Sequence, residues 1–256
     1  FLGDTLPEIA REKAGIIKPR VPVVIGETQA AIQDVFLGRA GECGSAIYFA
    51  DQHYGVKVRS GTISGMAVDV ELDDTTLYRN LRVEAYGEYQ RRNVQTVLQA
   101  LDLLKGPLDK ISEAALRDGL GNIRALTRFV GRWQQLGERP LILCDSAHNE
   151  AGVREAVSQL RTLTYRKLHI VMGMVKDKDR SKLLEMLPKD ATYYFARPHI
   201  PRGLDADILK KEAAGFGLQG RSYVGVEEAL AAARKIASVE DLIFVGGSVF
   251  VVAEVV

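Results

Sequence analysis

The residues best suited to chemistry follow directly after an apolar run, in the segment CDSAHN at 144–149. The apolar run predicts a buried parallel strand, and the amphipathic pattern after it predicts a helix. Ligands of open α/β sheets lie outside the carboxyl ends of the strands, so Asp145 and His148 would stand at a ligand-binding edge. Asn149 could cap the helix. Alternatively, Asp145 simply ends the strand and His148 is a solvated loop residue.

Two basic features could bind phosphate. Arg132 follows Gly131 within the arginine-rich stretch 121–140, and a guanidinium group matches the geometry of phosphate oxygens. The same stretch could equally be a solvated basic linker. Lys13 lies on the inner side of a predicted helix, near its C-terminal end. It could face a phosphate or metal site, or it could complement the helix dipole while its aliphatic stem packs.

The elements that position CDSAHN belong to a regular alternation of strands and helices from residue 140 onward. This alternation predicts a mostly parallel, doubly wound sheet. His169 lies inside a strand pattern and is interpreted as core packing. The expected strands are 141–145, 167–174, 191–196, 221–224 and 241–246, and the expected helices are 150–162, 179–187, 205–215 and 226–237.

The first half of the chain has a different pattern. A helix capped by Asp4 or Thr5 is expected to precede short strands at 21–26 and 46–50, with a helix at 28–42 between them. Alternating residues between Tyr54 and Tyr86 predict three antiparallel strands. A long helix then runs to Leu104, followed by another near 112–120, and 121–140 is interpreted as the connection between two domains. The buried stripe of the long helix is expected to be Val94, Val97, Leu98, Leu101 and Leu104.

Composition limits the class of protein. The 256 residues are 46% hydrophobic and 26% charged, which is typical of a globular protein. Lysine plus arginine number 34 against 33 acidic residues, so charge gives no reason to expect nucleic acid or an anionic membrane as a partner. Cys43 and Cys144 form no metal-binding spacing and are expected to be buried thiols. A cytoplasmic, monomeric protein is therefore expected.

Seven segments together resemble the folylpolyglutamate synthase/dihydrofolate synthase family, which is related to the Mur ligases. They occur in the family's order and span nearly the whole chain. The segments are LGDTLPEIAREKAGIIKP (2–19), GEYQRRN (87–93), Gly131-Arg132, CDSAHN (144–149), GMVKDKD (173–179), Pro201-Arg202 and FVGGS (244–248).

The resemblance implies both a fold and an activity. Residues 1–126 would be the C-terminal part of a central ATPase domain, and 127–256 a Rossmann-like glutamate ligase domain. The enzyme would transfer the γ-phosphate of ATP, with Mg²⁺, to a carboxylate of dihydropteroate or folate. The amino group of L-glutamate would then attack the acyl phosphate. Such catalysis depends mainly on positioning and on neutralising charge.

The same resemblance implies roles for particular residues. Lys13 matches a lysine that is carbamylated, and Asn93 matches an ATP-contacting asparagine. Arg132 matches an arginine that reaches the phosphates, Asp145 an ATP-binding aspartate, and His148 the histidine of the same segment. In the segment after the second strand, Asp177 and Lys178 match residues near the ligand edge.

The chain also departs from the family pattern. Tyr89 stands where histidine is usual, Val130 where proline is usual and Ser146 where glycine is common. The phosphate loop TGTNGKGS is absent, and no Gly-Lys-Ser/Thr occurs in the chain. The loop and the magnesium ligands are expected upstream of Phe1, so residues 1–256 alone are expected to be inactive.

Two other interpretations remain. The chain could be a non-catalytic, nucleotide-binding Rossmann-like module, which a G-x-G-x-x-G fingerprint after a strand would favour, but the sequence has none. It could also be a non-catalytic interaction protein, for which a large exposed apolar patch would be the mark.

Overall fold

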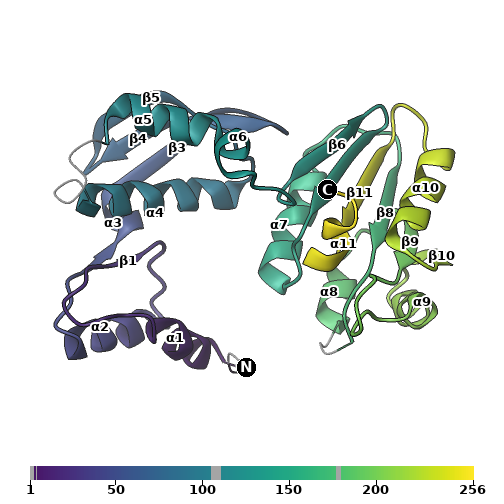
Figure 1. Ribbon diagram of the computed structural model, residues 1–256, viewed down its shortest axis with the longest axis horizontal. Coiled ribbons are helices and arrows are strands. Elements are labelled where there is room, and N and C mark those ends of the chain that lie inside the picture. The colour runs from purple at the N-terminus through teal and green to yellow at the C-terminus, as the bar shows by residue number, and fades with distance from the viewer. Residues whose placement is uncertain (1–2, 4, 105–110, 177–179) are drawn as a thin grey trace. The chain divides into compact units, whose positions relative to one another are not determined.

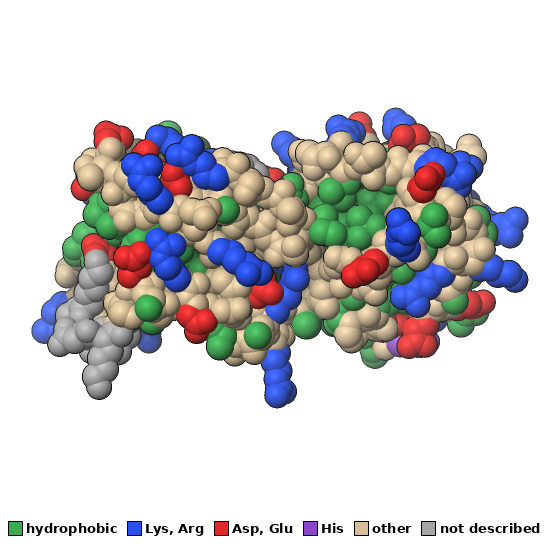
Figure 2. Space-filling model, turned by 90° about the horizontal axis from the view of Figure 1, so that it is seen from above, with side chains coloured by type: hydrophobic (Ala, Val, Ile, Leu, Met, Phe, Trp, Pro, Cys, Tyr) green, Lys and Arg blue, Asp and Glu red, His purple; other side chains and the backbone are tan. Residues whose placement is uncertain are grey.

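The computed structural model describes residue 3 and residues 5–104, 111–176 and 180–256 (Figure 1). The chain forms two compact units, Phe1–Ile123 and Arg124–Val256. The division falls three residues before the domain boundary expected from the sequence. On the face shown in Figure 2, basic and acidic side chains are interspersed on both units. None of the described helices combines the length and the apolar character needed to cross a bilayer.

The first unit begins with a capped helix, α1 (Leu6–Ala14). The Thr5 hydroxyl accepts from the backbone N–H of Glu8, and the Glu8 carboxylate accepts from the N–H of Thr5, which completes a capping box. Two short parallel strands, β1 (Val23–Ile25) and β2 (Ile47–Phe49), follow, with α2 (Gln33–Glu42) between them. The helix α3 (Ala50–His53) leads into the next sheet.

The antiparallel sheet of the first unit carries its main core. Its strands β3 (Tyr54–Thr62), β4 (Gly65–Leu72) and β5 (Thr75–Val83) pair in sequence order. The helices α4 (Glu88–Leu104) and α5 (Glu113–Gly121) pack on one face of this sheet. The core formed there contains Val56, Val68, Val70, Leu81, Val94, Leu98 and Leu116.

The predicted buried stripe of α4 is only partly right. Val94 and Leu98 are buried, whereas Val97 and Leu104 are 39% and 41% exposed. Gln95 is buried instead, because its side-chain amide donates to the carbonyl of Tyr54 at 2.5 Å. A paired amide can replace an apolar residue at a helix–sheet contact, because its polar atoms remain hydrogen bonded.

The second unit is a six-stranded sheet with the strand order β10-β9-β8-β11-β7-β6. All neighbouring strands are parallel except β6, which pairs antiparallel to β7 at one edge. The strands are β6 (Gln134–Glu138), β7 (Leu141–Asp145), β8 (Leu168–Met172), β9 (Thr192–Ala196), β10 (Gln219–Tyr223) and β11 (Leu242–Gly246). The helix α6 (Ile123–Thr127) crosses the division between the two units. The helices of the second unit are α7 (Glu150–Leu160), α8 (Ser181–Met186), α9 (Ala206–Ala214), α10 (Val226–Ile236) and α11 (Val249–Ala253).

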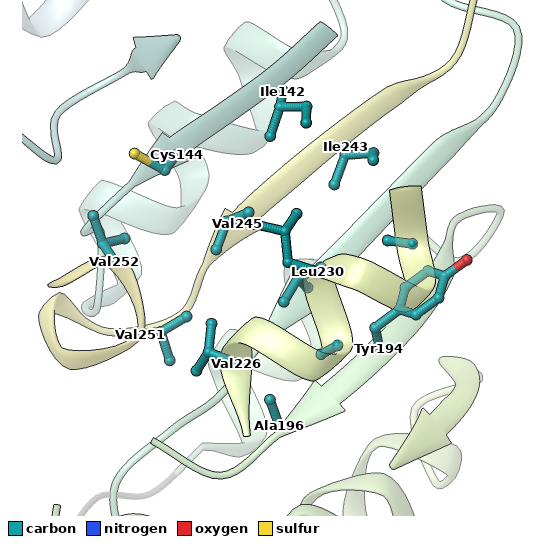
Figure 3. Close-up of a cluster of buried hydrophobic side chains, with 13 residues drawn as sticks. Ile142, Cys144, Tyr194, Ala196, Val226, Leu230, Ile243, Val245, Val251 and Val252 are labelled. Carbon is teal, nitrogen blue, oxygen red and sulfur yellow. The ribbon is translucent and has the colours of Figure 1, made fainter. Parts of the chain in front are cut away.

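Helices cover both faces of this sheet, which confirms the predicted doubly wound fold. Figure 3 shows the core on one face, where Val226 and Leu230 of α10 and Val251 of α11 meet Ile243 and Val245 of β11. Side chains alternate along a strand, so Phe244 points to the opposite face, toward α7 and α8. The five predicted parallel strands are present, but β6 lies within the stretch interpreted as a connection, and that part of the interpretation is wrong.

His169 is buried, as predicted, but its surroundings are polar. Its Nδ1 lies 3.0 Å from the hydroxyl of Tyr194, and its Nε2 lies 3.5 Å from Oδ2 of Asp241. Asp241 also pairs with Arg166 through two hydrogen bonds of 3.0 and 3.2 Å. These contacts join β8, β9 and the start of β11 at the edge where the strands begin. His169 therefore contributes to the fold, away from the edge where the strands end.

Candidate functional site

Three strand ends of the second unit lie side by side at the carboxyl edge of the sheet. Asp145, the last residue of β7, is in register with Gly246 of β11, which is in register with Met172 of β8. This is the edge at which open α/β sheets bind their ligands, between strands whose connections leave in different directions. The residues that follow these strands are therefore the candidates for binding.

The Asp145 carboxylate is held by backbone N–H groups. Its Oδ2 accepts from Trp133 and its Oδ1 from Ala147, both at 2.8 Å. The residue is only 5% exposed. Burial raises the pKa of Asp145, whereas the two N–H donors and the charge of Arg132 lower it. Burial has the larger effect, so Asp145 retains its proton to a higher pH than an ordinary aspartate.

The turn before β6 carries Arg132. Gly131 has a φ of +75° and Trp133 a φ of 43°, so the chain reverses sharply here. The carbonyl of Gly131 accepts from the N–H of Ser146 at 3.0 Å, and the N–H of Gly131 donates to Oε1 of Gln134 at 2.7 Å. The indole of Trp133 is buried and anchors the turn. The turn is thereby fixed to the CDSAHN segment.

Fixing this turn places a cation beside the buried acid. Nη1 of Arg132 lies 3.8 Å from Oδ1 of Asp145, while 41% of the Arg132 side chain is exposed. The guanidinium can therefore neutralise Asp145 and still present N–H groups to a ligand. Of the residues predicted from the sequence, the structure brings these two together.

His148 and Asn149 lie at the start of α7. Asn149 caps the helix, as predicted, since its Oδ1 accepts from the N–H of Gly152 at 2.8 Å. His148 is exposed, and its Nδ1 lies 3.1 Å from the carbonyl of Ser146. A carbonyl only accepts, so Nδ1 carries the proton in this contact and Nε2 is not used by it. His148 is thus available to a ligand at the edge.

The other two predicted residues belong to the first unit. Asn93 is exposed in α4, and its amide donates to Oε1 of Gln90 at 2.9 Å. Lys13 is exposed in the last turn of α1, where Ala10 and Ala14 are the buried residues. The prediction that Lys13 lies on the inner side of the helix is therefore wrong. If the chain belongs to such a ligase, Arg132 and Asp145 should face Asn93 across the cleft between the domains, and this stays a prediction.

The structure also shows features of the edge that sequence reasoning missed. Glycines line it where a side chain would not fit: a Cβ on Gly173 would lie 2.5 Å from the carbonyl oxygen of Ala196, and one on Gly247 would lie 2.8 Å from that of Gly173. Gly247 belongs to the FVGGS motif and Gly173 to the GMVKDKD motif, but neither motif revealed why a glycine is needed. The apolar cavity beneath the edge has a volume of about 20 Å³, room for roughly one water molecule, so it is too small for a larger ligand.

Within the part of the chain that the structure describes, metal ligands are not gathered at this edge. Among the described residues, no three histidine, cysteine or acidic side chains cluster so that they could hold a metal ion. Both oxygens of Asp145 already accept hydrogen bonds from the backbone. Asp177 and Lys178, predicted near the ligand edge, lie outside the described residues.

Comparison with known families accounts for the geometry of the second unit. Residues 131–249 match the profile of the Mur ligase, glutamate ligase domain. The second unit contains a Mur ligase glutamate ligase domain. Its boundaries enclose both the Arg132 turn and the carboxyl ends of β7, β8 and β11.

Relatives are similar to the chain beyond this domain. A probable bifunctional folylpolyglutamate synthase/dihydropteroate synthase of Haloferax volcanii is 33% identical over 260 residues, 99% of this chain and 30% of that protein. The dihydrofolate synthase/folylpolyglutamate synthase of Escherichia coli is 28% identical over 261 residues, 100% of this chain and 56% of that protein. The chain thus spans about a third to just over half of these relatives' lengths.

Solved structures extend the likeness to the fold. E. coli FolC in complex with DHPP and ADP has a TM-score of 0.81 and 27% identity, with 100% of this chain and 57% of that chain covered. The bifunctional folylpolyglutamate synthase/dihydrofolate synthase of Yersinia pestis, complexed with AMPPNP and Mn, has a TM-score of 0.80 and 28% identity. The likeness covers 100% of this chain and 57% of that chain. The resemblance to the folylpolyglutamate synthase/dihydrofolate synthase family is therefore confirmed, and with it the fold class. The glutamate ligase domain holds three of the five predicted site residues.

Proposed function

We propose that this chain is part of an ATP-dependent ligase that joins L-glutamate to a carboxylate of dihydropteroate or a folate. The observation that carries the proposal is the pairing of Arg132 with the buried Asp145 at the carboxyl edge of the glutamate ligase domain. The names of the relatives support the reaction, and their structures with ADP or AMPPNP support ATP as the phosphate donor.

In the proposed reaction, the substrate carboxylate takes the γ-phosphoryl group from ATP and releases ADP. The amino group of L-glutamate then attacks the acyl phosphate, an amide bond forms, and phosphate and a proton leave. Negative charge accumulates on phosphate oxygens during both steps. A cation in a fixed position lowers the energy of such states without reorganisation.

The roles proposed for the residues in the second unit come from the family resemblance. Arg132 donates to phosphate oxygens, and Asp145 orients it and binds the nucleotide. The backbone N–H of Trp133 and that of Ala147 keep Asp145 in place. His148 presents Nε2 to the ligand at the same edge. These assignments follow the family resemblance, and the contacts of Asp145 support them.

The roles in the first unit rest on the resemblance alone. Asn93 would contact ATP, and the carbamate of Lys13 would place an anion near a metal ion. The first unit would then be the C-terminal part of an ATPase domain, with the boundary of the two domains near residues 126–127. The Y. pestis structure and another solved structure of a folylpolyglutamate synthase/dihydrofolate synthase contain Mn, which supports a divalent metal, and Mg²⁺ is proposed as the ion. Among the described residues, no three histidine, cysteine or acidic side chains lie close enough together to hold this ion.

The proposal is tested with the full-length gene product, ATP, Mg²⁺ and L-glutamate, with dihydropteroate or tetrahydrofolate as acceptor. Mass spectrometry should detect an acceptor carrying one more glutamate, formed together with ADP. Arg132→Ala should remove most of this activity, whereas Arg154→Ala, at an exposed arginine of α7, should not. ATP binding without any glutamate adduct would instead support a non-catalytic nucleotide-binding module.

A further inference from the structure

The short helix α11 separates two arginine-bearing loops at the carboxyl edge. It follows β11 directly and is capped by Ser248, whose hydroxyl accepts from the N–H of Val251 at 3.2 Å. Val251 and Val252 anchor the helix in the core of the sheet (Figure 3). Because α11 is fixed in this way, loops that pack on it are held in position.

One side of α11 contacts the turn that bears Arg132. Gly131 lies so close to Val252 that an added Cβ would be 2.9 Å from the Cγ1 of the valine. A larger residue at 131 would therefore displace α11 or the turn.

The other side of α11 holds the loop after β9. Residues 250 and 254 are four apart and share a helix face, whereas 252 lies roughly opposite. Glu254 accepts from the backbone N–H of His199 at 2.6 Å and from its ring Nδ1 at 3.1 Å. The guanidinium carbon of Arg202 lies 5.1 Å from the ring centroid of Phe250, which is within the range of a cation–π contact.

The Arg202 loop is also tied to the segment after β8. The N–H of Lys176 donates to the carbonyl of Arg202 at 3.0 Å, and Val175 bridges to Gly203. Glu254 and this bridge thus hold the loop from both sides. Within the described part of the chain, no carboxylate lies within ion-pairing distance of Arg202, which is exposed.

We propose that Arg202 binds a carboxylate of the incoming L-glutamate, and that Glu254 is a positioning residue that keeps Arg202 on Phe250 by holding His199. This inference rests on the ligase function proposed above. The reaction brings two separate anions to the domain, the phosphates of the nucleotide and the carboxylates of the amino acid. Arg132 stands beside Asp145, and α11 separates it from Arg202. The two cations therefore serve different anions.

The proposal predicts a specific kinetic pattern in the full-length gene product. Arg202→Ala should raise the KM for L-glutamate by about tenfold or more and leave the KM for ATP unchanged, because a substrate contact is lost. Glu254→Ala should raise the KM for L-glutamate several-fold. Glu254→Gln, which retains one accepting oxygen for the N–H of His199, should have a smaller effect.

A double mutant separates positioning from general damage. If Glu254 acts through Arg202, Glu254→Ala should add little in an Arg202→Ala background, because the two effects are not additive. The matched control is Glu228→Ala, which removes a similar contact to the N–H of Val224 in the loop after β10 and should leave the KM for L-glutamate unchanged. If Glu254→Ala does not fold, Glu254→Gln and Phe250→Leu provide the same comparison.

Two outcomes would overturn the inference. An unchanged KM for L-glutamate in Arg202→Ala would remove Arg202 from the amino-acid site. A full, additive effect of Glu254→Ala in the double mutant would show that Glu254 acts independently of Arg202. Both outcomes require a wild-type enzyme that ligates glutamate. An inactive wild type would instead contradict the proposed function.

Discussion

Oδ2 of Asp145 accepts a hydrogen bond of 2.8 Å from the backbone N–H of Trp133, twelve residues earlier in the chain. This bond joins the end of β7 to the turn that carries Arg132. The acid therefore has two functions in the proposed enzyme: it closes the turn, and it sets the position of the cation.

Replacing Asp145 should affect stability in a pH-dependent way. Asp145→Ala leaves two buried N–H donors without their acceptor and should cost about 1–3 kcal/mol, more than Asp145→Asn, which retains one oxygen. Burial raises the pKa of Asp145 in the folded protein. The stability that the wild type has over Asp145→Asn should therefore be greatest in acid, below the ordinary aspartate pKa of about 3.9, and should decrease as the pH rises through the folded pKa. Urea unfolding at several pH values measures this. A difference that grew with pH would contradict it.

Arg132→Ala should reduce catalysis far more than folding. Its side chain is 41% exposed, so we expect a change in unfolding free energy below about 0.5 kcal/mol. Losing a cation that stabilises the transition state should lower kcat by about a hundredfold or more. Steady-state kinetics and thermal denaturation of the full-length protein separate the two effects. An unchanged kcat would remove Arg132 from the mechanism.

Lys13→Ala should abolish most activity without a measurable change in melting temperature. Lys13 is exposed, and the buried contacts of α1 come from Ala10 and Ala14. Any loss of activity would therefore come from chemistry. Arg11→Ala, at another exposed basic residue of α1, is the control and should retain activity. Intact-mass analysis in bicarbonate should show one added carboxyl group on the wild type and none on Lys13→Ala. Equal activity of the two variants would refute the assignment.

Asp241→Asn should show the opposite pH dependence from Asp145→Asn. Its hydrogen bonds to Arg166 hold the pKa of Asp241 well below the ordinary value. Its contribution to stability is therefore fully present above the ordinary aspartate pKa of about 3.9 and is lost as the pH falls through the folded pKa. The variant should melt several degrees lower than the wild type at neutral pH. The difference in melting temperature between the variant and the wild type should narrow only in acid. Asp190→Asn, at an exposed residue, should melt at the same temperature as the wild type.

Four of the five parallel strands, β7, β8, β9 and β11, could be predicted from the sequence because they are largely buried and read as apolar runs. The fifth, β10, is a polar edge strand that could be predicted only from the alternation of strands and helices. The edge strand β6 was missed because Gln134-Gln135-Leu136-Gly137-Glu138 is polar and pairs on one side only. The reason is physical: an edge strand needs little apolar surface, and its register comes from its neighbour.

The candidate site, too, could be predicted from the sequence only in part. Asp145 could be predicted, because an acid that ends an apolar strand is visible in the sequence. Its partner, the backbone N–H of Trp133, could not, since main-chain donors leave no mark in the residue type. The position of Lys13 on the inner side of its helix was predicted wrongly, because a helical pattern alone does not show which residues other parts of the chain will cover.

The position of β11 has a consequence for how the protein is made. Among the described strands β11 comes latest in the sequence, yet it lies between β7 and β8. Until residues 242–246 have been synthesised, β11 is missing from the sheet. β7 and β8 then lack the strand with which each of them pairs in the folded protein. Pairing over such a long separation is slow and leaves strand edges exposed. A polypeptide that stops before Leu242 therefore lacks the strand that joins β7 to β8, and we expect it to aggregate instead of folding into a weakened form of the same sheet.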